Sequence, residues 1–180
     1  VAVGMGLGAE VPKEVVEEVV RSSRLVVVDA EGITDISFAV PTVITPHRGE
    51  LARLLNVKKD STVDQASTAM AALSNKVREV SIDLGVTVLL KGETDLISDG
   101  SRLKFNYTGN PGMTVGGTGD VLAGITAALL AKSKDPFRAA CAAAFISGVS
   151  GDLLYEKVGP HLTASGVADE IPKAINSCIR

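Results

Sequence analysis

The residues best suited to chemistry lie between Tyr107 and Leu130, in the sequence YTGNPGMTVGGTGDVLAGITAALL. Five glycines fall within 109–119, and apolar residues then recur at helical spacing. A glycine-rich backbone that leads into a helix presents free N–H groups and the positive end of the helix dipole. We therefore predict a binding site for phosphate or another anion here. Side chains at Gly116, Gly117 and Gly119 would keep the backbone away from the anion.

Asp120 follows these glycines directly, and an acid beside an anion site needs an explanation. One interpretation is structural, because aspartate favours the first turn of a helix, where it caps the backbone and complements the dipole. The other makes Asp120 the general base of a phosphoryl transfer, accepting the proton of an attacking hydroxyl while the glycine amides hold the phosphoryl group. Local chemistry alone leaves both interpretations open.

Two short aliphatic runs, 25–28 and 43–45, end in polar residues that could bind a ligand. Asp29 follows the first run, and His47 and Glu50 follow the second at the start of a predicted helix. Polar residues past the carboxyl ends of parallel strands line the ligand crevice in open α/β sheets. Glu50 could orient a water bound to Mg²⁺, which prefers oxygen ligands. The alternatives are a cap or turn for Asp29, a structural histidine, and a solvated first-turn acid.

A third aliphatic run, 86–90, delivers Lys91 at its end, followed by Gly92, Glu93, Thr94 and Asp95. Lys91 could reach a nucleotide phosphate, and the alternative is a lysine in a surface turn. Near the start of the chain, the glycines of 4–8 resemble a dinucleotide-binding fingerprint, but the third glycine comes too early. A plain tight turn explains that segment as well.

The rest of the pattern alternates strands with helices, which favours a parallel sheet in one domain over residues 1–180. We expect strands at 1–3, 25–28, 43–45 and 86–90, and a hairpin of 96–98 and 102–107 joined by the two-residue turn Asp99-Gly100. Helices are predicted at 12–21, 46–55, 62–83, after Gly119, and at 136–156 and 163–179. Gly85 is expected to close the third of these helices.

Composition narrows the class of partner. The 180 residues are 46% hydrophobic but only 3% aromatic, so the core consists of Val, Leu, Ile and Ala, as in buried parallel strands. The net charge is −3 with no basic stripe, which argues against nucleic acid. No apolar run is long enough to span a membrane. Cys141 and Cys178 lack metal-ligand spacing, which fits a reducing compartment, and we expect a cytoplasmic protein.

The motifs GMGLG, DAEG, TPHRGE, LKGETD and TGNPGMTVGGTGDVLAG occur in this order over essentially the whole chain. Together they resemble the ADP-dependent NAD(P)H-hydrate dehydratase family, which has the ribokinase-like superfold, a mostly parallel sheet flanked by helices on both faces. The resemblance implies repair of hydrated NADH or NADPH (NADHX or NADPHX). The C6 hydroxyl would be phosphorylated by ADP (or ATP) and eliminated as phosphate, giving NAD(P)H and AMP.

The resemblance also assigns roles to residues. Asp120 would be the catalytic base, and Glu50 would lie near Mg²⁺, if necessary through water. The anion hole would comprise Gly116, Gly117, Thr118 and Gly119. The hydrated dinucleotide would contact Gly6, Gly8, His47 and Asn110. The adenine nucleotide would contact Lys91, Gly92, Glu93, Thr94, Asp95 and Gly119, and we expect a homo-oligomer.

Two departures from the family pattern qualify these roles. Many relatives have threonine where Asp95 lies, and family members carry further strands and helices before GMGLG, so we expect the front portion of the fold to be missing from this chain. Alternatives are a ribokinase-like kinase acting on a thiazole or pyrimidine alcohol, and a non-catalytic nucleotide-binding module. A Rossmann-type oxidoreductase fits less well, because the glycine spacing in 4–8 is wrong.

Overall fold

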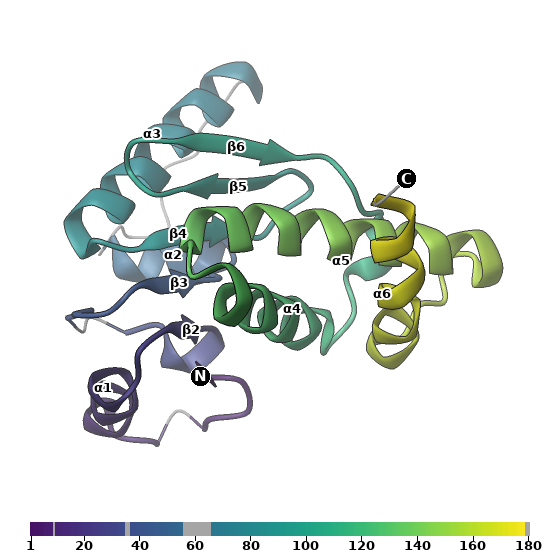
Figure 1. The fold of residues 1–180 in the computed structure, drawn as a ribbon. Coiled ribbons are helices and arrows are strands. Elements are labelled where there is room, and N and C mark those ends of the chain that lie inside the picture. Colours follow the sequence, from purple (N-terminus) through teal and green to yellow (C-terminus); the bar gives the residue numbers. More distant parts are fainter. Residues whose placement is uncertain (9, 35–36, 56–65, 179–180) are drawn as a thin grey trace.

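The computed structural model describes residues 1–8, 10–34, 37–55 and 66–178. Its centre is a six-stranded sheet whose strands lie side by side in sequence order (Figure 1). The first four strands are parallel to one another, the fifth runs antiparallel to the fourth, and the sixth runs antiparallel to the fifth. The strands are β1 (Ala2–Val3), β2 (Val26–Val28), β3 (Thr42–Ile44), β4 (Thr87–Leu90), β5 (Asp95–Ser98) and β6 (Leu103–Asn106). The predicted mostly parallel sheet is confirmed.

Helices cover both faces of this sheet (Figure 1). One face packs against α1 (Lys13–Ser22), α2 (Arg48–Leu54) and α3 (Ala66–Leu84). The other packs against α4 (Thr118–Ser133) and α5 (Pro136–Val158), and α6 (Ala164–Cys178) lies against α4 and α5. Two short 3₁₀ helices, η1 (Ala30–Gly32) and η2 (Pro111–Met113), follow β2 and β6. This is the predicted α/β architecture.

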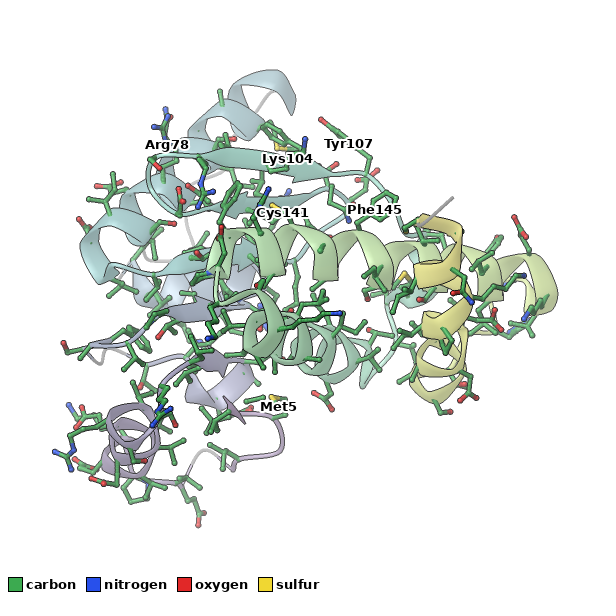
Figure 2. All side chains as sticks on the ribbon, viewed as in Figure 1. Met5, Arg78, Lys104, Tyr107, Cys141 and Phe145 are labelled. Atoms are coloured by element: carbon green, nitrogen blue, oxygen red, sulfur yellow. The ribbon has the colours of Figure 1, made fainter. Side chains whose placement is uncertain are left out.

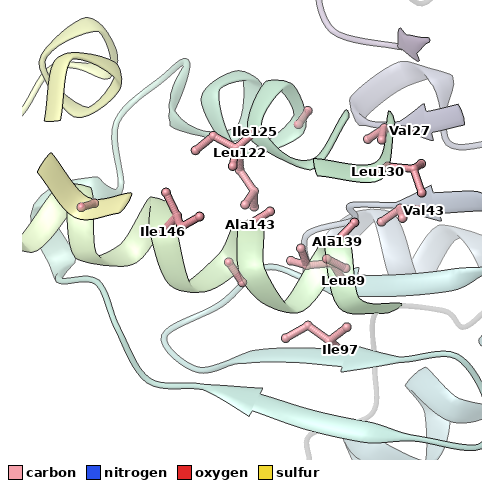
Figure 3. Close-up of a cluster of buried hydrophobic side chains, with 14 residues drawn as sticks. Val27, Val43, Leu89, Ile97, Leu122, Ile125, Leu130, Ala139, Ala143 and Ile146 are labelled. Carbon is pink, nitrogen blue, oxygen red and sulfur yellow. The ribbon is translucent and has the colours of Figure 1, made fainter. Parts of the chain in front are cut away.

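Alternate residues of each strand enter opposite cores, which explains the unbroken aliphatic runs. Val26 and Val28 pack with α1, α2 and α3, whereas Val27 packs on the other face with Val43 and Leu89. Figure 3 shows that second cluster between the sheet and helices α4 and α5. Successive strand side chains point to opposite faces, so a strand covered on both sides is mostly apolar, although β3 and β4 each begin with a buried threonine.

Helix α5 is the central helix of the second face. By length and composition its 23 residues could cross a membrane, contrary to the expectation from the sequence that no apolar run is long enough, yet more than half of this apolar stretch is buried within the protein. Alanines at 139, 140, 143 and 144 allow it to pack closely on α4 and the sheet. Burial against these elements accounts for its apolar character, as expected for the core helix of an α/β domain.

Most predicted element boundaries differ from the structure by one or two residues. The hairpin turn was predicted wrongly, because β5 and β6 are joined by the four residues 99–102 rather than by two. The side chain of Asp99 closes this wider loop, since its Oδ1 accepts from the N–H groups of Ser101 (3.1 Å) and Arg102 (2.7 Å). The first residues of the helix predicted at 62–83 lie outside the described residues.

Candidate active site

Three charged side chains meet where β2, β3 and β4 end. Lys91 Nζ donates to Asp29 Oδ1 at 2.7 Å and lies 4.0 Å from Glu50 Oε2. Thr45 Oγ1 donates to the same oxygen of Asp29, also at 2.7 Å. The Asp29 and Glu50 side chains are only 2% and 6% exposed, and that of Lys91 is 21% exposed. The single ammonium group offsets one of the two buried negative charges, and hydrogen bonds from Thr45 to Asp29 and from the His47 N–H to Glu50 support the burial of both carboxylates.

His47 caps α2 and also faces solvent at the same place. Its Nδ1 accepts from the N–H groups of Gly49 (2.9 Å) and Glu50 (3.1 Å), and Glu50 Oε2 accepts from the His47 N–H at 2.7 Å. Because Nδ1 is an acceptor, the neutral ring carries its proton on Nε2. The side chain is 59% exposed and lines the cavity described below, and its Nε2 lies 3.4 Å from Glu50 Oε1, so the ring can contact a ligand beside that carboxylate. The structural and ligand-binding interpretations of His47 are therefore compatible.

A cavity of about 1010 Å³ opens beside this cluster. Its volume is at the upper end of ordinary small-molecule sites, roughly 300–1,000 Å³, and suits a ligand of nucleotide size. Tyr107, labelled in Figure 2, is among its lining residues. The cavity brings together ten residues that the sequence pointed to: His47, Lys91, Gly92, Glu93, Thr94, Asp95, Asn110, Gly116, Thr118 and Gly119.

The predicted anion site lies at the start of α4, where Gly116, Thr118 and Gly119 line the cavity and Gly117 does not. Gly117 is the N-cap with φ +93°, a left-handed conformation that favours glycine. The first N–H groups of a helix have no partner within it and can bind an anion, although the Thr118 N–H already donates to the Val115 carbonyl oxygen at 3.4 Å. A Cβ atom at Gly119 would lie 3.4 Å from Lys91 Nζ and 3.6 Å from Asp29 Oδ2. The helix N-terminus and the lysine therefore converge on one position.

The hydroxyl of Thr118 stabilises the turn that precedes α4. Its Oγ1 donates to the carbonyl oxygens of Met113 and Val115, both at 2.9 Å. The side chain therefore fixes the turn before α4, and its backbone is the part suited to an anion. Asp120 is exposed in the first turn of α4 and is not among the residues that line the cavity. Its role as a base stays a prediction, and so does the alternative of a dipole-complementing acid.

The glycine-rich turn after β1 has a packing role at its first glycine. A Cβ atom at Gly4 would lie 1.7 Å from the carbonyl oxygen of Asp29, so only glycine lets this turn approach the end of β2. Gly6 and Gly8 have no atoms within 4 Å of such a Cβ, and neither is among the residues lining the cavity. Their assignment to the hydrated dinucleotide stays a prediction.

The surroundings of Glu50 suit a magnesium ion that is bound through water rather than directly. Both Glu50 oxygens lie near protein donors, and the described residues hold no group of three His, Cys, Asp or Glu side chains that could bind a metal directly. Mg²⁺ characteristically keeps several waters and takes one or two carboxylates together with substrate phosphates. Glu50 would therefore hold it indirectly.

Asp95 lies on the side of the cavity that is predicted to bind the adenine nucleotide. Its Oδ1 accepts from the Gly92 N–H (3.1 Å), and its Oδ2 accepts from Asn106 Nδ2 (3.0 Å). Burial raises the pKa of this carboxyl above its ordinary value, although both hydrogen bonds act in the opposite direction. The carboxylate closes the turn from Lys91 to Asp95, a role that the departure from the family's threonine left open.

One important residue escaped the sequence reasoning. Asp152 lies in α5, and its carboxylate accepts from the Gly109 N–H (3.0 Å) and from Asn110 Nδ2 (2.9 Å). No local signal marks it, because an acid in a helix of small residues has the pattern of a surface position. Its partners lie more than forty residues earlier in the chain, at separations of 43 and 42.

Comparisons with known proteins agree with this geometry. The family model described as NAD(P)H-hydrate dehydratase matches residues 1–173. The bifunctional NAD(P)H-hydrate repair enzyme Nnr of Archaeoglobus fulgidus is 45% identical over 183 residues, which cover 99% of this chain and 35% of that protein. The ADP-dependent (S)-NAD(P)H-hydrate dehydratase of Cenarchaeum symbiosum is 40% identical over 133 residues, covering 74% of this chain and 44% of that protein.

A solved structure shows the same fold. The ADP/ATP-dependent NAD(P)H-hydrate dehydratase of Bacillus subtilis, co-crystallised with ATP/Mg²⁺, superposes with a TM-score of 0.83 and 26% identity over 98% of this chain and 63% of that chain. A ribokinase-like superfamily protein of Enterococcus faecalis gives a TM-score of 0.80 at 25% identity, covering 98% of this chain and 62% of that one. The chain thus spans about a third of the curated repair enzyme and under two thirds of the solved dehydratase. It belongs to the NAD(P)H-hydrate dehydratase family, with a ribokinase-like fold.

Proposed function

We propose that this protein repairs hydrated NADH or NADPH by an ADP-dependent dehydration that releases NAD(P)H, AMP and phosphate. The observation that carries the proposal is the convergence of Lys91 and the N-terminus of α4 on one side of a nucleotide-sized cavity. A cation and a helix N-terminus together suit a phosphoryl group in transfer. The relatives are named as ADP-dependent dehydratases, and the Bacillus enzyme was crystallised with ATP/Mg²⁺.

The chemistry balances as a phosphoryl transfer followed by an elimination. The C6 hydroxyl oxygen of the hydrated ring attacks the terminal phosphorus of ADP, AMP leaves, and the hydroxyl proton passes to Asp120. The backbone N–H groups at the start of α4 and the Lys91 ammonium offset the charge on the phosphoryl oxygens. The ring nitrogen's lone pair then expels phosphate from C6, and loss of the C5 proton restores the double bond. Magnesium, when bound, neutralises the phosphates of the nucleotide.

The decisive experiment uses chemically hydrated NADH with ADP and Mg²⁺, and follows the return of the NADH absorbance. Asp120→Asn should lower turnover by a factor of about 10²–10⁴, the usual contribution of a general base, and should still bind ADP in calorimetry. Asp83→Asn, an exposed acid near the end of α3, is the matched control and should keep wild-type turnover.

Two results would contradict the proposal. One is that no NADH returns with ADP or with ATP while a thiazole or pyrimidine alcohol is phosphorylated, which would make the protein a kinase. The other is nucleotide binding without any turnover in the unmodified protein, which would make it a binding module.

We further propose a homo-oligomer and a cytoplasmic location. Tyr107 and Phe145, labelled in Figure 2, leave large apolar surfaces exposed, at 75% and 44%. Apolar side chains exposed in this way favour association with another copy. Free thiols at Cys141 and Cys178 and a nucleotide co-substrate fit a reducing, nucleotide-rich compartment. Light scattering after size exclusion tests the first statement, and imaging of a tagged protein tests the second.

A further inference from the structure

Helix α5 packs against the loop that forms one wall of the cavity. This loop, residues 108–113, contains Gly109, Asn110 and Met113, which all line the cavity. Its start is tied to α5 through Thr108, whose Oγ1 donates to the Phe145 carbonyl oxygen at 3.3 Å. The shape of the wall therefore depends on a helix that lies behind it.

Both carboxylate oxygens of Asp152 are used on this loop. Oδ2 accepts from the Gly109 N–H at 3.0 Å, and Oδ1 accepts from Asn110 Nδ2 at 2.9 Å. Asn110 Oδ1 in turn accepts from the Gly112 N–H at 3.1 Å and caps η2. Hydrogen bonds to a charged acceptor are stronger than neutral ones. One carboxylate thus sets the backbone at Gly109 and the side-chain orientation of Asn110 together.

Two glycines on α5 make this close approach possible. A Cβ atom at Gly148 would lie 2.1 Å from Thr108 Oγ1, and one at Gly151 would lie 2.1 Å from Met113 Sδ. Positions 148, 151 and 152 are spaced i, i+3 and i+4, so they share one face of the helix. This face of α5, made by Gly148, Gly151 and Asp152, fits against the loop, and we call it the cradle.

The cradle also reaches the anion site. The loop continues through η2 to Met113, whose carbonyl oxygen accepts from Thr118 Oγ1 at 2.9 Å, and Thr118 begins α4. A chain of hydrogen bonds and short backbone segments therefore connects Asp152 with the backbone N–H groups predicted to hold the phosphoryl group. Asp152 itself is not among the residues lining the cavity, so it acts through the loop.

We propose that Asp152 is a positioning residue for nucleotide binding and phosphoryl transfer, because it holds Gly109, Asn110 and, through η2, the start of α4 in place. The turnover part of this inference rests on the proposed function, whereas the binding part does not. A negative charge behind a site for a polyanion would weaken binding if it acted directly. The Asp152 carboxylate must therefore favour binding through the geometry that it imposes on the loop.

The test compares Asp152→Asn with Glu156→Gln in the natural full-length protein. Glu156 is an exposed acid one turn later on α5, so this control makes the same change of charge away from the loop. Asp152→Asn should raise the Kd for ADP and lower kcat by about tenfold each, the effect of losing one hydrogen bond to a charged group. Hydrogen exchange measured by mass spectrometry should accelerate in 108–118 and stay unchanged elsewhere. Glu156→Gln should match the wild type.

A second variant keeps the inference falsifiable if the first is unstable. In Asn110→Asp/Asp152→Asn, the amide introduced at position 152 can donate to the carboxylate introduced at 110 and accept from the Gly109 N–H. This swap should restore slow exchange in 108–118. The inference is overturned if Asp152→Asn binds ADP like the control, if its exchange accelerates throughout the protein, or if the swap restores nothing. Wild-type protein that binds ADP but forms no NADH refutes only the proposed function.

Discussion

Replacing Gly148 with alanine tests how closely the cavity wall approaches α5. The new methyl group would lie 2.1 Å from Oγ1, 2.6 Å from the carbonyl carbon and 2.7 Å from the carbonyl oxygen of Thr108. Ordinary contact begins near 3.4 Å, so the Thr108 carbonyl carbon would have to move by about 0.8 Å. The bonds from Thr108 Oγ1 to the Phe145 carbonyl oxygen (3.3 Å) and from the Gly109 N–H to Asp152 (3.0 Å) would lengthen with it.

The free energy of unfolding should fall by about 3 kcal/mol, which combines three contributions. Overpacking costs about 2 kcal/mol, two weakened hydrogen bonds cost about 1 kcal/mol each, and alanine regains about 1 kcal/mol through its higher helix propensity. Displacement of Gly109 and Asn110 should also weaken ADP binding, because both residues line the cavity.

Urea unfolding of Gly148→Ala beside Gly124→Ala gives a sharp comparison. Gly124 lies on the exposed side of α4, and a Cβ atom there would meet nothing within 4 Å. Its replacement should therefore raise stability by about 0.5–1 kcal/mol, from helix propensity alone. If Gly148→Ala were as stable as the wild type, or gained stability like Gly124→Ala, the close approach of loop and helix would be wrong.

Three further predictions concern the charged residues of the site and one glycine. Asp29→Asn should cost about 2 kcal/mol in thermal unfolding, because the partly buried Lys91 loses its nearer carboxylate, at 2.7 Å, and keeps Glu50 at 4.0 Å. Asp29→Asn/Lys91→Gln should cost less, and equal costs would contradict the pairing. Gly119→Ala should keep its melting temperature but bind ADP about tenfold more weakly in calorimetry, because the methyl group occupies the position where the phosphoryl group would lie. Asp95 has a raised pKa, so its folded form binds a proton more tightly than the unfolded chain. The wild type should therefore gain stability relative to Asp95→Asn as the pH falls from 7 toward 4 in urea titrations, and a constant difference would refute this.

The sheet and the location of the site could be predicted because their signals are local. Strands covered on both faces are mostly apolar, so β2 and residues 88–90 of β4 appear as short aliphatic runs. Polar residues that line the cavity follow such runs directly, as Lys91 does after β4. The glycines before α4 are equally local, since the left-handed N-cap at Gly117 favours glycine.

The partners of these residues could not be predicted, because they are distant in the chain. Asp29 and Lys91 are 62 residues apart, and nothing in either local pattern indicates that they pair. His47 is a different case, because serine, threonine, asparagine and aspartate are the usual N-cap residues. The spacing of His47 and Glu50 is that of a capping box, but histidine is an unusual N-cap, so the sequence left its structural alternative unspecified.

The glycines around the site serve two different purposes, and this separates what binds a ligand from what shapes the binding site. A Cβ at Gly119 would contact Lys91 and Asp29 at ordinary distances, so packing does not require glycine there, and the proposed phosphoryl site gives a reason for its lack of a side chain. Gly148 and Gly151 face Thr108 and Met113 instead, so their lack of side chains serves helix-to-loop packing. The glycine-rich loop therefore does not determine its own conformation. Helix α5 packs behind the loop and sets its conformation. The loop motif therefore predicts where a phosphoryl group would bind, and α5 determines how accurately the loop would hold that group.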